Sequence, residues 1–158
     1  TYYFNSSGEM QKNWISIDDT YYYFGSNGKY VDDDGTRMIS EALKYVGNPY
    51  VYGENSLTNG TDCSGYVYLI HKMYGYDIER RASLQYSSSK KISSSSLKPG
   101  DLVFYCENGN DVDHVAFYVG TINGTDDCIV HAANSRKGII VSTRTYWSVT
   151  KKYGTYWR

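Results

Sequence analysis

The pattern of hydrophobic positions predicts two amphipathic helices followed by a series of strands. Apolar residues recur at intervals of three and four over 36–46 and 63–74, and Gly47 and Gly75 mark the ends of these helices. Apolar runs at 102–106, 114–120, 128–133 and 138–142 predict four strands, and the Tyr- and Trp-rich tail is a candidate for another. A Ser-rich run at 87–96 is expected to form a surface loop. Helices that precede an antiparallel meander indicate an α+β domain.

An internal repeat of 20 residues occupies the start of the chain. YYFNSSGEM at 2–10 returns as YYFGSNGKY at 22–30, and each copy has the aromatic run, polar turn and Gly of a β-hairpin. So short a unit cannot bury its own aromatic face and normally stacks on further copies. The acidic stretch before Gly35 predicts a boundary, so we expect a repeat unit at 1–31, a linker at 32–36 and a second domain at 37–158. The chain begins inside this pattern without Met, so we expect it to be a fragment of a longer protein.

Composition and charge narrow the class of protein. The net charge is −1, which argues against a nucleic-acid-binding protein. Nineteen tyrosines among many Ser, Asn and Gly residues are typical of an extracellular protein. No apolar run reaches the length of a membrane span. We therefore expect a secreted protein with no membrane span and no nucleic-acid partner.

Cys63 is the first candidate for chemistry. It follows the N-cap residue types Thr61 and Asp62, which places it in the first turn of the second predicted helix. The helix N-terminus favours a thiolate, and a neighbouring element could supply a base. The alternative, a buried cysteine that acts as a small hydrophobic residue, stays open. Cys106 and Cys128 are expected at opposite ends of the sheet, so we expect three free thiols, two of them inert.

Two of the three histidines are candidates for catalysis. His71 lies more than two helical turns from Cys63 and is expected to be a surface or packing residue. His114 begins one strand and His131 lies in the next, opposite or diagonal on one face, which we expect to pack on the Cys63 helix. Nucleophile, base and orienting residue would then be Cys63, His114 and His131. A metal site made of the same three residues is a competing interpretation that requires a fourth ligand from water.

Five motifs together resemble the NlpC family of papain-like cysteine peptidases, which cut peptidoglycan stem peptides. The resemblance covers about residues 37–158 and implies a papain-like α+β domain without a cofactor. It implies that Cys63 is the nucleophile, His114 the base and His131 the third member of the triad. It also implies substrate-binding roles for Tyr50, Asp62 and Ser64. The matching segments are 48–53 (NPYVYG), 62–67 (DCSGYV), 98–104 (KPGDLVF), 114–120 (HVAFYVG) and 129–132 (IVHA).

Some positions depart from the family pattern. Glu54 replaces the second Gly of a Tyr-x-Gly-Gly motif. Residues 78–85 resemble a segment that reads Pro-Arg-Thr-Ser…Gln, but Glu79 replaces the Pro and Ala82 replaces the Ser. Arg80 is then a candidate contact for a substrate carboxylate. These differences affect the choice of substrate more than the triad.

The N-terminal repeats resemble the cell-wall-binding repeats of choline-binding and glucan-binding proteins. The resemblance implies a saccharide or choline-type ligand, with Trp14, Tyr22 and Tyr23 as candidate contacts. Asn13 stands where Gly usually precedes the Trp, and Tyr21 stands in place of the second Trp. The alternative is that these aromatic residues only pack one repeat on the next.

The sequence as a whole predicts a secreted peptidoglycan hydrolase of a Gram-positive bacterium or its phage. The resemblance implies cleavage of the D-γ-glutamyl–diamino acid bond, with the repeats holding the enzyme on the wall. Two alternatives stay open: an N-acetylmuramoyl-L-alanine amidase with the same nucleophile, and a non-catalytic wall-binding module. Whether the stem contains Lys or diaminopimelate is also open.

Overall fold

The computed structural model describes residues 1–158 and confirms the α+β class. Its helices are α1 (Asp34–Leu43), α2 (Cys63–Met73) and α3 (Ala82–Ser88), with 3₁₀ turns η1 (Ser94–Ser96) and η2 (Arg144–Tyr146). The strands are β1 (Asn13–Ile17), β2 (Thr20–Phe24), β3 (Tyr30–Val31), β4 (Asn55–Ser56), β5 (Gly60–Thr61), β6 (Lys90–Lys91), β7 (Leu102–Cys106), β8 (His114–Ile122), β9 (Thr125–Asn134), β10 (Gly138–Thr143) and β11 (Thr150–Thr155). No helix is both long enough and apolar enough to cross a bilayer.

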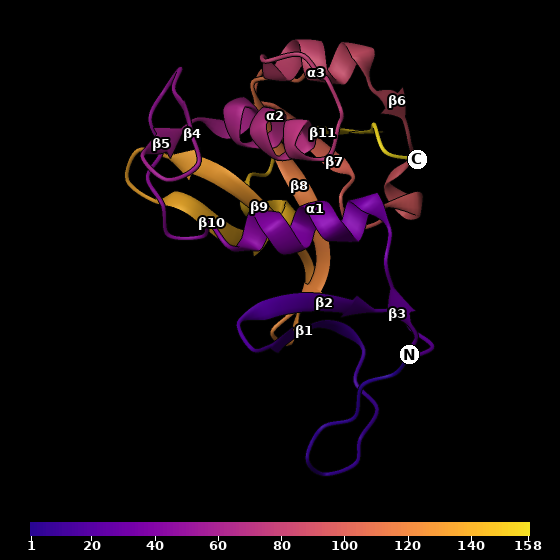
Figure 1. Ribbon diagram of the computed structural model, residues 1–158. Coiled ribbons are helices and arrows are strands. Elements are labelled where there is room, and N and C mark those ends of the chain that lie inside the picture. Colours follow the sequence, from indigo (N-terminus) through magenta and orange to yellow (C-terminus); the bar gives the residue numbers. More distant parts are fainter.

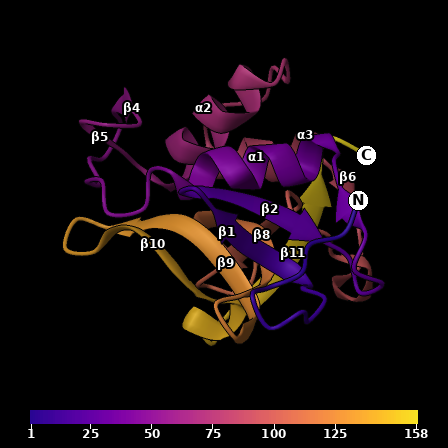
Figure 2. The same ribbon diagram turned by 60° about the horizontal axis from the view of Figure 1, so that its bottom comes forward.

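One large sheet carries the domain, and helices α1 and α2 lie along one of its faces (Figures 1 and 2). Strand β8 is central: it pairs antiparallel with β7 and β9, and β10 adds to β9. On the far side of β7 come β11 and then the short β6. The four strands predicted from the apolar runs are all present, and the C-terminal tail contributes β11.

The core forms where α1 and α2 meet the sheet. Tyr66 of α2 is fully buried, packs edge-to-face on Phe117 of β8 and donates a hydrogen bond from its hydroxyl to the carbonyl of Ala42 in α1. Val115, Phe117 and Val119 of β8 alternate with Ala116 along the strand and share the face that meets the helices. Ala116 belongs to a smaller cluster on the opposite face.

The N-terminal segment extends the same sheet. Strands β1 and β2 form a hairpin, β3 pairs with β2, and β1 pairs parallel with β8 at Trp14 and Ile122 (Figure 1). The second repeat copy therefore forms the predicted hairpin, β2–β3. The first copy closes through a single bridge between Phe4 and Met10. Residues 1–31 thus share a sheet with the rest of the chain.

Two local predictions were wrong in detail. The first helix begins at Asp34 and ends at Leu43, since Asp33 and Thr36 form a capping box and the chain leaves the helix at Lys44. Val46 consequently lies outside the helix and is exposed. The expected loop at 87–96 overlaps the end of α3 and contains β6 and η1. In α3, the hydroxyls of Ser87 and Ser88 donate to carbonyls four residues earlier, which satisfies these serines within the helix.

Candidate active site

Cys63 is the first residue of α2 and meets the sheet where β8 begins. Asp62 caps the helix by accepting from the backbone N–H of Gly65, at 2.9 Å. Cys63 is 8% exposed and belongs to the core cluster. Backbone N–H groups of Ser64 and of Val115, the residue after His114, act on its sulfur. The start of α2 and the start of β8 therefore place the thiol beside His114.

Burial decides the charge state of the thiol. Removal from water raises the pKa of Cys63 to about 11, although the backbone N–H groups of Val115 and Ser64 act in the opposite direction. The expectation that the helix N-terminus makes Cys63 a thiolate is therefore wrong for the substrate-free protein. The free protein holds a neutral thiol, and a base has to remove its proton during the reaction.

The two other triad candidates meet directly. Nε2 of His114 lies 2.9 Å from Nδ1 of His131. Phe117 pairs with Val130, so His131 lies beside Ala116 and diagonal to His114, one of the two arrangements that the sequence predicts. Burial lowers the pKa of both histidines, to about 3 for His131 and well below the ordinary value for His114. The pair is therefore neutral at physiological pH.

The histidine face of the sheet is not the face that α2 covers. Both rings lie on the side of Ala116 and Tyr105, where Trp147 packs edge-on against His114 with 4.4 Å between ring centroids. The expectation that this face packs on the Cys63 helix is wrong, because α2 packs on Val115 and Phe117. Cys63 approaches the His114–His131 pair at the N-terminal end of β8.

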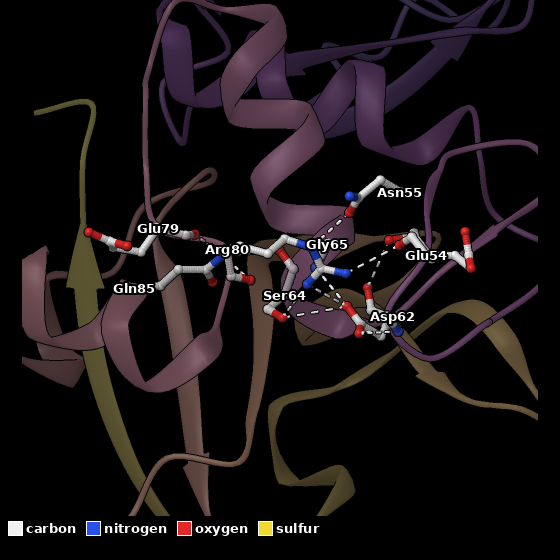
Figure 3. Close-up of polar contacts among 10 residues, drawn as sticks. Glu54, Asn55, Asp62, Ser64, Gly65, Glu79, Arg80 and Gln85 are labelled. Carbon is white, nitrogen blue, oxygen red and sulfur yellow. Dashed lines mark hydrogen bonds and ion pairs between the residues drawn. The ribbon is translucent and has the colours of Figure 1, made fainter.

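A polar network beneath the site holds Arg80, Asp62 and Ser64 together (Figure 3). The Arg80 guanidinium contacts the Asp62 carboxylate and the Ser64 hydroxyl, each at 2.9 Å. It also donates to the Asn55 side chain at 2.7 Å and to the carbonyl of Glu54 at 3.2 Å. Arg80 thus joins the loop before α2 to the start of that helix, and most of its donors are already used.

This network also keeps Asp62 ionised and requires a glycine at position 65. Burial raises the pKa of Asp62, but hydrogen bonds from Arg80, Gly53 and Gly65 outweigh it, so the net pKa is lowered and the carboxylate stays ionised. A Cβ at Gly65 would lie 2.8 Å from Nη2 of Arg80 and would overlap the Thr61 hydroxyl. The Gly of the DCSG motif is therefore needed for the close approach of Arg80.

Tyr50 and the first turn of α2 are placed to act on a substrate carbonyl. Tyr50 lines the groove that contains Cys63. Burial and the nearby Cys63 raise the pKa of Tyr50 to about 12, which keeps its O–H protonated as a donor. The first backbone N–H groups of a helix have no partner within the helix. That of Cys63 is thus a natural donor to an oxyanion beside the sulfur.

Two hollows flank the catalytic residues. The larger, about 550 Å³, contains Tyr50, Asp62, Cys63, Arg80 and Arg81 among its lining residues. The smaller, about 280 Å³, lies on the His114 side and is lined by Tyr105, Glu107, Asp113, His114, Trp147 and Val149. Asp113 lines both, so the two hollows adjoin, one at Cys63 and the other at His114.

The remaining predicted residues lie elsewhere. Trp14 is 4% exposed, and its indole N–H donates to the carbonyl of Val119 at 2.8 Å, which gives it a packing role in the sheet. Tyr22 is exposed on β2, and Tyr23 is partly buried against Trp14. His71 is fully buried and stacks on Phe117, so it is a packing residue.

All three cysteines are unpaired, as predicted. Cys106 and Cys128 are buried away from the two hollows. No three His, Cys, Asp or Glu side chains converge in the way that a metal site requires.

Sequence reasoning missed two residues of the site. Ser142 of β10 places its hydroxyl 2.9 Å from Nε2 of His131, and Trp147 covers His114. Neither belongs to a motif. For Ser142 the available signal was its position in the strand that follows His131, but the register of β10 against β9 shifts next to Gly138. Only the folded sheet shows which residue of β10 reaches His131.

A thiol at a helix N-terminus beside a paired histidine on a strand defines a papain-like cysteine-dependent site. The profile of the NlpC/P60 family matches residues 47–158, and the chain belongs to this family. A putative cell wall binding repeat matches residues 1–10 and 12–30.

Curated relatives agree with this assignment. A probable endopeptidase p60 of Listeria monocytogenes is 41% identical over 93 residues, which cover 57% of this chain and 19% of that protein. The bifunctional muramidase/DL-endopeptidase CwlT of Bacillus subtilis is 40% identical over 85 residues, which cover 52% of this chain and 26% of that protein. The chain thus matches about a fifth to a quarter of the length of these relatives.

Solved structures show the same fold. The NlpC/p60 domain of the peptidoglycan hydrolase SagA has a TM-score of 0.65 and 30% identity, covering 79% of this chain and all of that one. An NlpC/P60 family protein from Bacillus cereus aligns with a TM-score of 0.70 and 21% identity, covering 98% of this chain and 58% of that one. The second likeness supports the fold alone.

Proposed function

We propose that residues 37–158 form a cysteine peptidase that hydrolyses an amide bond of peptidoglycan stem peptides. The observation that carries this proposal is the meeting of Cys63, at the start of α2, with His114, at the start of β8, whose ring is hydrogen-bonded to His131 of β9. Similarity to the Listeria endopeptidase and to the SagA domain supports the substrate class.

The proposed reaction starts from a neutral Cys63 thiol and a neutral His114 imidazole. His114 takes the thiol proton as the sulfur of Cys63 attacks the amide carbonyl, and the oxyanion is received by the N–H of Cys63 and the O–H of Tyr50. The C–N bond then breaks, His114 gives its proton to the leaving amine, and a thioester remains on Cys63. Water, deprotonated by His114, hydrolyses the thioester to a carboxylic acid and the free thiol. His131 orients His114 through both steps.

The direction of the substrate follows from this proton transfer. Because His114 protonates the leaving nitrogen, the amine product lies over the smaller hollow, which His114 lines. The acyl part then occupies the larger hollow. There Arg81 is exposed and free of ion pairs, while Arg80 is held by Asp62 and Ser64. Arg81 is therefore better placed than Arg80 to meet a substrate carboxylate.

We propose the D-γ-glutamyl–diamino acid bond as the scissile amide. An acyl residue linked through its γ-carbonyl keeps a free α-carboxylate, which suits the cationic side of the larger hollow. Two relatives from Bacillus subtilis carry the names DL-endopeptidase and gamma-DL-glutamyl hydrolase, which agree with this bond.

Residues 1–31 are proposed to bind the cell wall, which makes the chain a two-part enzyme outside the cell of a Gram-positive bacterium or in its phage. The match to a putative cell wall binding repeat supports this part. Since Trp14 is buried, exposed Tyr22 and partly exposed Tyr23 are the contacts that we propose for a saccharide or choline-type ligand. Binding would raise the local concentration of the peptidase at the wall.

Mass spectrometry of digested peptidoglycan tests the proposal, with Cys63→Ala as the control. Walls with Lys and walls with diaminopimelate are digested in parallel. We expect new free amines on the diamino acid that are absent with Cys63→Ala. Free L-alanine amines would show an amidase instead. No release by the wild-type protein from either wall would leave only a wall-binding module.

A further inference from the structure

We propose that Ser142 is a positioning residue for the catalytic histidines: its hydroxyl oxygen accepts a hydrogen bond from the Nε2–H of His131. This bond holds His131 in the tautomer that lets His114 act as a base. The inference rests on the proposed peptidase function, and it assigns a role to a residue outside every motif of the sequence.

The geometry forms a continuous line of polar atoms across two strands. Nε2 of His114 lies 2.9 Å from Nδ1 of His131, and Nε2 of His131 lies 2.9 Å from the Ser142 hydroxyl. Strand β10 brings Ser142 there, because Ile140 pairs with His131 and Ser142 pairs with Ile129. Both distances are ordinary hydrogen-bond lengths.

The positions of the hydrogens follow from the role of His114. A neutral imidazole carries one N–H, and a base needs a lone pair on the nitrogen that faces the thiol. Nε2 of His114 is occupied by His131, so Nδ1 of His114 has to stay unprotonated. Nε2–H of His114 then donates to Nδ1 of His131, and the hydrogen of His131 is on Nε2. That hydrogen requires an acceptor, which Ser142 provides.

The opposite arrangement would disable the site. If His131 carried its hydrogen on Nδ1, Nε2 of His114 would have to accept it. The hydrogen of His114 would then lie on Nδ1, which could not take the proton of Cys63. In the productive arrangement the Ser142 hydroxyl accepts from the N–H at Nε2 of His131, which would otherwise be a buried donor without a partner.

No other group can replace the serine. His131 is fully buried, so solvent does not reach it. Its other close neighbours are the rings of Tyr146 and Trp147, with centroids at 5.3 and 5.4 Å. The remaining titratable groups around the pair are Cys63 from α2, Tyr105 from β7, and Glu107 and Asp113, which line the hollow beside His114. None of these groups forms a hydrogen bond with Nε2 of His131, whose partner is the Ser142 hydroxyl.

Steady-state kinetics on a soluble stem peptide test the proposal. Ser142→Ala leaves a buried N–H without a partner, and we expect kcat to fall about tenfold with KM within about twofold. Ser142→Thr keeps the hydroxyl and should remain within about threefold of the wild type. The matched control is Thr143→Ala on the same strand, whose hydroxyl contacts Thr145 and not the histidines. Equal kcat for Ser142→Ala and the wild type would overturn the proposal.

A double-mutant cycle separates positioning from a general structural effect. If Ser142 acts through His131, Ser142→Ala should have no further effect in a His131→Ala background. The same tenfold loss in both backgrounds would show that Ser142 acts elsewhere and would overturn the proposal.

The tautomer can be observed without turnover. In ¹⁵N-histidine-labelled protein at pH 7, we expect the NMR signal of protonated Nε2 for His131 in the wild type and a shift toward the other tautomer in Ser142→Ala. A wild-type His131 protonated on Nδ1 would contradict the proposal. Because this measurement needs no substrate, it stays decisive even if the wild-type protein cleaves no stem peptide, a result that would overturn the proposed function instead.

Discussion

Removal of the Arg80 side chain should destabilise the protein much more than removal of its neighbour Arg81. In Arg80→Ala, the Asp62 carboxylate loses an ion pair at 2.9 Å, and Ser64, Asn55 and the Glu54 carbonyl lose a donor. The Asp62 side chain is 9% exposed, so water compensates little for the loss.

The magnitude follows from the burial of the two partners. Breaking a buried ion pair by removing one partner costs about 3–5 kcal/mol. The Arg80 side chain is 28% exposed, and Asp62 keeps its bonds from the N–H groups of Gly53 and Gly65. Both features reduce the loss. We therefore expect the free energy of unfolding to fall by about 2–3 kcal/mol.

Urea denaturation at pH 7 measures this effect. The midpoint should fall in Arg80→Ala with an unchanged m-value. Arg81→Ala is the matched control: Arg81 is exposed and has no ion pair, so its loss should change the stability by less than about 0.5 kcal/mol. Equal midpoints for the two variants would refute the assignment of Arg80 as the structural arginine of this pair.

Three further predictions concern the sheet, acid stability and the thiol. Trp14→Phe should cost about 1–2 kcal/mol, because the buried Val119 carbonyl loses its indole donor, and calorimetry should show a lower Tm than for the exposed control Tyr22→Phe. Burial lowers the pKa of His71 to about 4 and of His131 to about 3, so the unfolded chain binds protons first as the pH falls below about 6.5. Stability should therefore fall by about 2 kcal/mol per histidine between pH 7 and pH 5, and a flat profile in chemical denaturation would contradict this. Alkylation of Cys63 by iodoacetamide should accelerate beyond pH 9, since burial raises the pKa of this thiol to about 11; a plateau near pH 7 would indicate a thiolate–imidazolium pair instead.

Local features of the chain were sufficient to predict much of the fold. The N-cap Asp62 and the spacing of Val67 and Ile70 depend only on neighbouring residues, and α2 begins where they indicate. Strand alternation likewise separates Ala116, on the His114 side of β8, from Val115 and Phe117 on the other side. The diagonal contact of His114 with His131 could also be predicted, because a short connection between antiparallel strands limits their register.

What the sequence could not predict depends on packing between distant segments. The periodicity of α2 does not tell which face of the sheet it covers, so the histidine face was assigned wrongly. The pKa of Cys63 depends on burial by β8 and on core packing, which outweighs the local effect of the helix N-terminus. Helix α3 was missed because its serines are poor helix formers by propensity and are satisfied by bonds to their own helix.

The N-terminal segment shows the same limit. Trp14 was a candidate ligand contact, with packing between repeats as the alternative, but it is held in the sheet by its hydrogen bond to Val119 and by the pairing of β1 with β8. That pairing joins residues more than a hundred positions apart, and nothing in the repeat itself indicates it.

The most direct test of the account is the rate at which the protein cleaves a soluble stem peptide that contains the D-γ-glutamyl–diamino acid bond, compared with Cys63→Ala. The account predicts release of the diamino acid amine by the wild type and a loss of at least about 10⁴-fold in kcat for Cys63→Ala, because Cys63 is the only thiol that lines the groove. Circular dichroism should confirm that both proteins are folded. Cleavage by Cys63→Ala at a rate within tenfold of the wild type would contradict the central role of this cysteine.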